Sequence, residues 1–192
     1  MEPRLNEAQA GQRTLFFVEA AHFVLAPFLG FLWSWNRLWI QAPAGRQRLN
    51  LMAALNAVSH ELALVANTTY INALSMCELL NQIAAMKLTT PITLVLDNAR
   101  YQKCRLVQDL AQSLKIELLY LPPYSPNLNL IERLWKFVKK QCLTCRYYEN
   151  FAPFQQAILA CLEQTQTRFK TDLDSLLTLK FQTFQKVQLL TV

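Results

Sequence analysis

The chain has 192 residues, a length that fits one domain and can bury a substantial core. Apolar residues make up 53% of the chain and charged residues 17%, which excludes a disordered or collagen-like protein. The net charge of +6 favours a polyanionic partner, and the first dozen residues lack the apolar stretch of a secretory signal peptide.

The cysteines argue against a zinc site, and the longest uncharged stretch argues against a membrane-spanning helix. Five cysteines at irregular spacing predict free thiols in a reducing compartment, and the lone pair Cys142 and Cys145 lacks the second ligand pair of a zinc site. Residues 20–36 are uncharged, but Pro27 and Gly30 interrupt them and they are shorter than the about 20 apolar residues of a spanning helix. We therefore expect no membrane insertion.

The first third of the chain predicts strands. Residues 1–13 are expected to form a flexible tail, followed by one domain over residues 14–190. The apolar run at 15–18 predicts a buried strand that ends at Glu19, and residues 33–41 are also strand-like. Residues 49–58 and 62–66 predict a hairpin, although their alanine and leucine content leaves the first half open to a helix.

Helices and strands then alternate. Residues 73–87 carry apolar side chains at helical spacing, and residues 92–96 form an unbroken apolar run typical of a central strand. A helix at 102–114, a strand at 116–121 and a proline-rich loop at 122–129 follow, and then helices at 130–141, 153–166 and 173–188. This order predicts an α/β fold: a mixed sheet flanked by helices on both faces, with extra C-terminal helices.

Two acidic residues directly follow apolar strands, Glu19 in the first case and Asp97 in the second. Functional sites in open α/β sheets form at the carboxyl ends of strands, and an acid there must face solvent, a metal or a cation. Asp97 could instead be a cap or turn residue before the helix that follows it.

A third acid, Glu132, stands in the first turn of the helix at 130–141. At 100° per residue the apolar side chains form one arc, and the opposite arc carries Glu132 with Arg133, Lys136, Lys139 and Lys140. This basic face could lie along a phosphate backbone, or it could be a solvated surface on which Glu132 and Lys136 pair. Three prolines stiffen the approach, and Asn127 or Asn129 could cap the helix.

Two segments resemble a known family. Residues 94–100 (LVLDNAR) and 121–132 (LPPYSPNLNLIE), with 34 residues between Asp97 and Glu132, resemble the second and third catalytic blocks of mariner-related DDE transposases of bacterial insertion sequences. Residues 16–23 (FFVEAAHF) match the first block, and the resemblance extends from about Thr14 to Phe184.

The resemblance implies a ribonuclease H-like domain in which Glu19, Asp97 and Glu132 hold two Mg²⁺ or Mn²⁺ ions. It implies metal-dependent cleavage and strand transfer of double-stranded DNA at insertion-sequence ends, by a homodimer in the nucleoid of a bacterial cytoplasm, with no small-molecule substrate. The DNA-binding residues we expect are the four cations of the helix at 130–141 together with Arg100, Lys103, Tyr124 and Ser125.

The chain departs from the family at the first acid. The family pattern has Asp where this chain has Glu19, which is longer by one methylene, so we predict that cleavage is impaired. Two alternatives stay open: a catalytically inactive DNA-binding remnant, and another nuclease or integrase of the same fold. The 13 residues before the first strand are too few for a helix-turn-helix domain, and His22 could reach the site.

Overall fold

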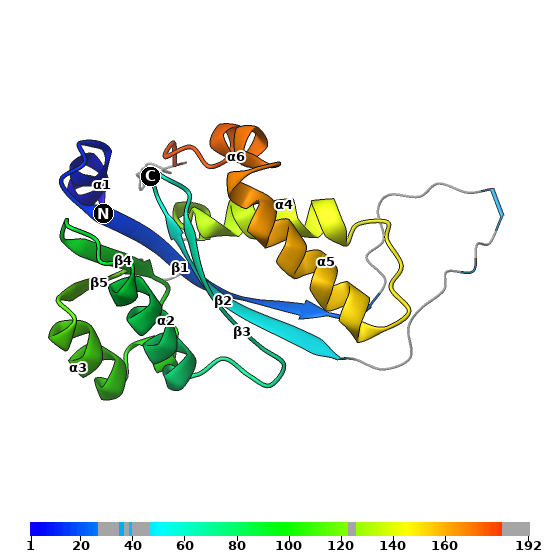
Figure 1. Cartoon of the computed structure of the whole chain (residues 1–192), viewed down its shortest axis with the longest axis horizontal. Helices are drawn as coiled ribbons and strands as arrows, with labels where there is room; N and C mark the ends of the chain where they lie inside the picture. The colour runs from blue at the N-terminus through cyan, green and yellow to red at the C-terminus, as the bar shows by residue number, and fades with distance from the viewer. Residues whose placement is uncertain (27–34, 37–38, 40–46, 123–125, 182–192) are drawn as a thin grey trace, which may run out of the picture.

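Five strands form one mixed sheet at the centre of the molecule. The structure is a computed structural model that describes residues 1–26, 35–36, 39, 47–122 and 126–181. Its strands are β1 (Thr14–Val24), β2 (Arg48–Asn56), β3 (Leu62–Asn67), β4 (Ile92–Leu96) and β5 (Ile116–Tyr120), and they lie in the order β3-β2-β1-β4-β5. The two long strands β1 and β2 cross the molecule in Figure 1.

The strand pairing explains the mixed character of the sheet. β1, β2 and β3 are antiparallel neighbours, as expected for strands joined without a helix. β4 pairs parallel to β1, and β5 pairs parallel to β4. These parallel pairs need crossover connections, and the helices α2 (Ala73–Ala85) and α3 (Arg105–Ser113) lie in them. The hairpin at 49–66 is confirmed as β2 and β3, and its first half is a strand.

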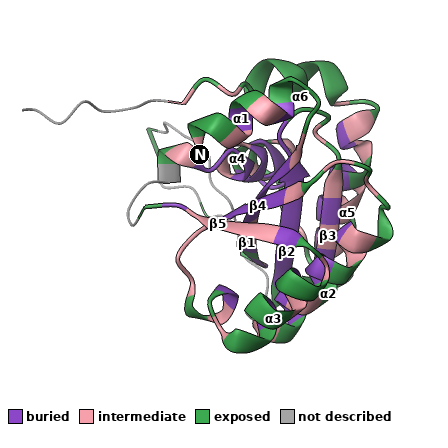
Figure 2. Cartoon of the chain, turned by 90° about the vertical axis from the view of Figure 1, so that its left-hand side faces the viewer, coloured by how far each residue is buried: buried purple, intermediate pink, exposed green. Residues whose placement is uncertain are grey.

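Helices cover both faces of the sheet and divide the core into two layers. α2 and α3 pack on one face around Phe16 and Val18. The helices α4 (Ile131–Cys142), α5 (Phe151–Glu163) and α6 (Lys170–Leu176) lie on the other side, and their apolar side chains share a cluster with Phe17 and Phe23. Figure 2 shows the buried strands between these two helical layers. The predicted α/β architecture is confirmed.

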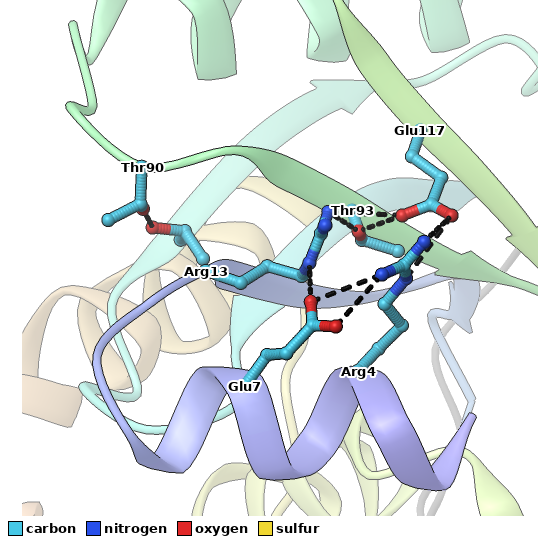
Figure 3. Close-up of polar contacts among 7 residues, drawn as sticks. Arg4, Glu7, Arg13, Thr90, Thr93 and Glu117 are labelled. Carbon is cyan, nitrogen blue, oxygen red and sulfur yellow. Dashed lines mark hydrogen bonds and ion pairs between the residues drawn. The ribbon is translucent and has the colours of Figure 1, made fainter.

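Residues 1–13 are not the flexible tail that we expected. A helix, α1 (Glu2–Gln9), occupies most of this segment and buries Leu5 and Ala8. Two apolar side chains are too few to produce a helical pattern in the sequence. Polar contacts hold the segment instead, because Arg4 and Arg13 both pair with Glu117 of β5 (Figure 3).

Parts of other expectations lie outside the described residues. The strand-like stretch at 33–41 is described only at positions 35, 36 and 39. The helix expected at 173–188 is observed only as α6, which ends at Leu176; residues 177–181 are not helical, and the rest of that range lies outside the described residues. Among the residues that the structure describes, no helix is both long and apolar enough to cross a membrane.

Candidate active site

Glu19 and Asp97 lie beside each other at the point where β1 and β4 separate. The two strands pair in parallel up to Val18 and Leu96, so Glu19 and Asp97 are the next residue of each chain segment. The carboxyl ends of these central strands therefore bring together two acids that are 78 positions apart in sequence, as positions 19 and 97 show.

Strand alternation predicts that both acids face the side of the sheet that α4 covers. Side chains alternate between the two faces along a strand, so Glu19 shares its face with Phe17, and Asp97 shares the face of Val95. Phe17 and Val95 both belong to the core cluster that includes α4. The alternation predicts that the two carboxylates stand under the start of this helix.

β1 does not end at Glu19, which corrects the expectation from the sequence. The strand continues to Val24, because β2 remains its partner as far as the pair Val24 and Arg48. A carboxylate inside a central strand is costly. However, the pairing of β1 with β4 stops after Val18, so the edge of β1 that faces β4 has no strand partner at Glu19.

Glu132 enters the same region from the first turn of α4. Its backbone N–H donates to the carbonyl of Asn129 at 3.3 Å, and its side chain is half-buried. Burial raises the pKa of the Glu132 carboxyl, and the charge of Lys136 opposes this rise. The helix thus has an acid at its start and basic side chains along its length.

The pKa of Glu19 depends on its burial and on the other two acids. Burial first, and then the negative charges of Glu132 and Asp97, raise the pKa of Glu19 to about 7, whereas Lys139 and Lys136 act in the opposite direction. Its Oε2 atom is buried without a hydrogen-bond partner among the described residues. A buried carboxylate beside two others is an unfavourable arrangement that a bound cation would relieve.

The donor set fits a hard divalent cation. Three carboxylates offer the oxygen ligands that Mg²⁺ and Mn²⁺ prefer, and the unpaired Oε2 of Glu19 is an acceptor that a cation could satisfy. Among the described residues, however, no three His, Cys, Asp or Glu side chains are grouped so that they could hold an ion as they stand. Carboxylates repel one another when no cation lies between them, so ion binding would require these side chains to turn inward.

Asp97 also has the turn role that the sequence left open. Its Oδ1 accepts a hydrogen bond from the backbone N–H of Ala99 at 3.2 Å. The neighbouring Asn98 donates from Nδ2 to the carbonyl of Leu121, which ties the end of β4 to the end of β5. These bonds fix the backbone at Asp97 and are compatible with a second role for its carboxylate.

Most of the predicted DNA-binding cations lie around this edge. Arg100 and Lys103 are exposed in the segment that follows Asp97, and Lys103 donates to Asn98. On α4, Lys136 and Lys140 are exposed, and Lys139 is half-buried with its Nζ 5.9 Å from the ring centroid of Phe23. Tyr124 and Ser125 lie outside the described residues.

Arg133 has an intramolecular role that the sequence did not indicate. Its guanidinium donates to the carbonyls of Leu176, Thr178 and Lys180 at 3.3, 2.7 and 2.9 Å. It also lies over the ring of Phe181, 5.7 Å from the centroid. These contacts engage both terminal nitrogens of the guanidinium, and the DNA-binding role of Arg133 stays a prediction.

Two residues near the acids were missed by the sequence analysis as parts of the site. Burial first, and then the charges of Asp97 and Glu19, raise the pKa of Tyr101 to about 12. Asn129 does not cap α4, since Leu130 holds the N-cap position without a side-chain cap, and its Nδ2 donates to Val18 instead. In the sequence, Asn129 stands three residues before Glu132. This position agrees with a role beside the acids and equally with a helix cap.

The remaining candidates lie away from the acids. His22 is three residues beyond Glu19, so the alternation of β1 places it on the opposite face, where its Nδ1 bonds Oδ1 of Asn50 at 2.7 Å. The two cysteines of the CxxC pair differ in environment, because Cys142 is buried and Cys145 is exposed.

Comparisons with solved structures identify the fold. The Mos1 transposase paired-end complex with the left transposon end has a TM-score of 0.58 at 13% identity, covering 91% of this chain and 59% of that one. The catalytic domain of the Mos1 mariner transposase has a TM-score of 0.51 at 13% identity, and 96% of this chain and 95% of that chain are covered. At such low identity these matches show the fold, which is the ribonuclease H-like fold of that catalytic domain.

The sequence comparisons extend from fold to family. An "Insertion element IS630 uncharacterized 39 kDa protein" of Shigella sonnei is 27% identical over 135 residues, which are 69% of this chain and 39% of that protein. The chain therefore spans about two fifths of the length of this curated relative. Residues 36–155 match the DDE superfamily endonuclease family, a range that includes Asp97 and Glu132 and begins after Glu19. Because this match covers more than half of the sequence, the chain belongs to the DDE superfamily endonuclease family.

Proposed function

We propose that this chain is the catalytic domain of a DNA transposase, which cleaves DNA at the ends of an insertion element and joins those ends to target DNA. The family match supports DDE endonuclease chemistry, and the relative from Shigella sonnei is named as a protein of an insertion element. A DNA substrate also agrees with the net charge of +6. A nucleoid location in a bacterial cell and action as a homodimer belong to the same proposal.

One observation carries the proposal: Glu19 and Asp97 directly follow the last paired residues of two parallel strands, and Glu132 stands in the first turn of α4, which packs on that sheet. The raised pKa of Glu19, which has burial as its main cause and the charges of the other two acids next, agrees with this placement. Acids that serve only as surface residues have no reason to be buried together. The assignment of Glu19 rests on this placement, since the family match begins after it.

The proposed mechanism assigns a role to each element. Two divalent ions, when bound, would activate the attacking water or 3′-hydroxyl and stabilise the leaving oxygen of the phosphodiester. Glu19 and Asp97 would hold them from the rigid sheet, and Glu132 would close the ligand set from α4. Tyr101, with its pKa raised to about 12, would keep its proton and remain a hydrogen-bond donor beside the acids.

The DNA backbone would lie across the cations beside this site. Arg100 and Lys103 flank the end of β4, and the basic face of α4 continues away from Glu132 through Lys136, Lys139 and Lys140. Phosphate contacts of this kind position DNA without reading its sequence. The DNA-binding roles of Tyr124 and Ser125 stay predictions from the family resemblance.

A second candidate function is a catalytically inactive DNA-binding domain. The observation that favours it is Glu19, which occupies the position where the family pattern has Asp. A side chain longer by one methylene displaces its carboxylate by about the 1 Å that can cost roughly a hundredfold in rate. Such a domain would keep the basic face and lose metal-dependent cleavage.

The substitution Glu19→Asp separates the two candidates. We expect the variant to nick supercoiled plasmid DNA at least about tenfold faster than the wild-type chain in Mg²⁺ or Mn²⁺, because the shorter side chain restores the family geometry. The matched control is Glu163→Asp, which makes the same change at an exposed position of α5. Equal rates for Glu19→Asp and wild type would contradict impairment by Glu19. Absence of nicking in both proteins would contradict the cleavage function and favour the inactive domain.

A further inference from the structure

Asn129 lies where the elements that carry the three acids meet. It follows the short helix η2 (Pro126–Leu128) and precedes α4, and it is 5% exposed. Its Nδ2 donates to the carbonyl of Val18 at 3.4 Å, and its own carbonyl accepts from the N–H of Glu132 at 3.3 Å. One residue therefore contacts the peptide that precedes Glu19 and the backbone of Glu132.

The direction of the Val18 carbonyl places Asn129 beside Asp97 as well. Backbone groups alternate between the two edges of a strand, and the N–H of Thr14 donates to Pro91 on the β4 side of β1. Val18 is four residues further along β1, so its carbonyl also faces β4. This is the last position at which the two strands pair, and the next residue of β4 is Asp97. The Asn129 amide thus lies at the junction from which Glu19 and Asp97 extend.

The Asn129 side chain is poorly explained as a stabilising group. Its Oδ1 is buried and has no hydrogen-bond partner among the described residues. Leaving a buried acceptor unpaired destabilises the folded chain, and a single 3.4 Å hydrogen bond from Nδ2 does not offset that cost. An apolar side chain of the same size would avoid this cost, so the amide needs an explanation other than stability.

We propose that Asn129 is a positioning residue, which ties the start of α4 to the end of β1 and thereby sets the separation of Glu132 from Glu19 and Asp97. This inference rests on the proposed function for its chemical meaning. The tie itself is a property of the metal-free chain. Metal ligands on separate elements need such a tie, because an ion site tolerates little misplacement of its carboxylates.

Asn129→Leu tests the tie directly, since leucine has a similar volume and no hydrogen-bonding groups. In the metal-free full chain we expect hydrogen exchange to become at least about fivefold faster at the first turn of α4 and around Val18, while the melting temperature stays within a few degrees. Asn129→Asp is the second variant, because it keeps the shape and replaces the Nδ2 donor with an oxygen. Asn150→Asp adds the same charge at an exposed position before α5 and should leave exchange at these two places unchanged.

Mn²⁺ binding, followed by electron paramagnetic resonance of the free ion, tests the consequence for the site. We expect Asn129→Leu to weaken binding at least about tenfold, and Asn150→Asp to bind as the wild type does. Unchanged exchange in both Asn129 variants would overturn the tie, and wild-type Mn²⁺ affinity in Asn129→Leu would overturn positioning. If the Asn129 variants exchange faster but the wild-type chain binds no Mn²⁺, the tie stands and only the proposed function is contradicted.

Discussion

Glu19 is a residue at which folding and the proposed chemistry make opposite demands. Folding buries its side chain beside Asp97 and Glu132, which disfavours its charged form and raises its pKa to about 7. Metal binding needs the same carboxylate to be charged. The metal-free chain should therefore carry a measurable electrostatic strain at neutral pH.

This strain predicts a pH dependence of stability. The pKa of Glu19 is about 7 in the folded chain, above the ordinary 4.5, because folding favours the protonated carboxyl. The stability that comes from protonated Glu19 is therefore fully present below about pH 4.5 and is lost as the pH rises through 7. The shift corresponds to at most about 3 kcal/mol, and less because the side chain is partly exposed. Urea unfolding of Glu19→Gln and wild type at pH 5 and pH 8, without metal, measures the difference.

We expect Glu19→Gln to be more stable than wild type at pH 8, with a smaller difference at pH 5. Glu163→Gln, at an exposed position of α5, controls for the loss of one negative charge. A stability difference between Glu19→Gln and wild type that does not change between the two pH values would contradict the burial of a strained carboxyl at position 19.

Among individual residues, sequence patterns identified the three acids as candidates but not the residues that hold the surrounding backbone. Glu19 and Asp97 follow apolar runs, and Glu132 follows a distinctive loop, so local patterns were enough to find them. Asn129 and Arg133 act through contacts with residues 111 and 43 to 47 positions away, and a local pattern carries no information about such contacts. Their sequence context suggested a helix cap and a DNA contact instead.

Among the elements, α4 has a second connection that the sequence did not predict. Arg133 in its first turn binds three carbonyls of residues 176–180, which brings the segment after α6 against the start of the helix. Phe181 continues this contact, because its ring centroid is 5.7 Å from that of Phe17 in β1. The chain after α6 is thereby held close to the elements that carry Glu19 and Glu132.

Arg133→Ala should release this segment. Hydrogen bonds from a charged donor contribute about 1.5–3 kcal/mol when well shielded, and we expect a loss of about 1–2 kcal/mol here because the contact is exposed. Limited proteolysis should cut earlier around residues 177–181, and urea unfolding gives the change in free energy. Lys140→Ala, an exposed cation on the same helix, is the control, and equal protease resistance in the two variants would contradict the role of Arg133.

The attachment of α1 is another element-level feature, built from polar contacts. Arg13 donates to Glu7, Thr93 and Glu117, and Arg4 pairs with both glutamates (Figure 3). Burial alone would raise the pKa of Glu117, but hydrogen bonds from Thr93 and Arg4 and the charges of both arginines hold it below the ordinary value. This cluster lies at the start of β4, which is the end of the strand opposite Asp97.

Arg13→Ala should destabilise the chain more than the removal of an exposed cation. The side chain of Arg13 is 13% exposed, and its loss leaves the hydroxyl of Thr93 and two carboxylates with fewer donors, so we expect a cost of about 1–3 kcal/mol. Arg105→Ala is the comparison, because Arg105 pairs with Asp109 while 94% exposed and should cost less than about 0.5 kcal/mol. Similar chemical denaturation midpoints for the two variants would show that the cluster does not anchor α1.

At the scale of the whole molecule, the sheet explains how distant residues reach one edge. β1 pairs with β4 in parallel up to Val18 and Leu96, so the acids that follow these two residues lie next to each other, and α4 packs on the face of the sheet that includes Phe17 and Val95. The alternation of strands and helices predicted this architecture correctly from the sequence. The strand order and the length of β1 were not predictable, because they depend on which neighbours remain paired beyond Val18.

The central claim is that Glu19, Asp97 and Glu132 form a site for two divalent ions, and counting bound Mn²⁺ by electron paramagnetic resonance tests it most directly. The wild-type chain should bind two ions, and Asp97→Asn should lose both or retain one weakly. Asp109→Asn makes the same change at an exposed position of α3 and should bind as the wild type does. Two ions in the wild type that are absent from Asp97→Asn are the result predicted here, whereas no bound Mn²⁺ in the wild type, or equal binding in Asp97→Asn, would contradict the claim.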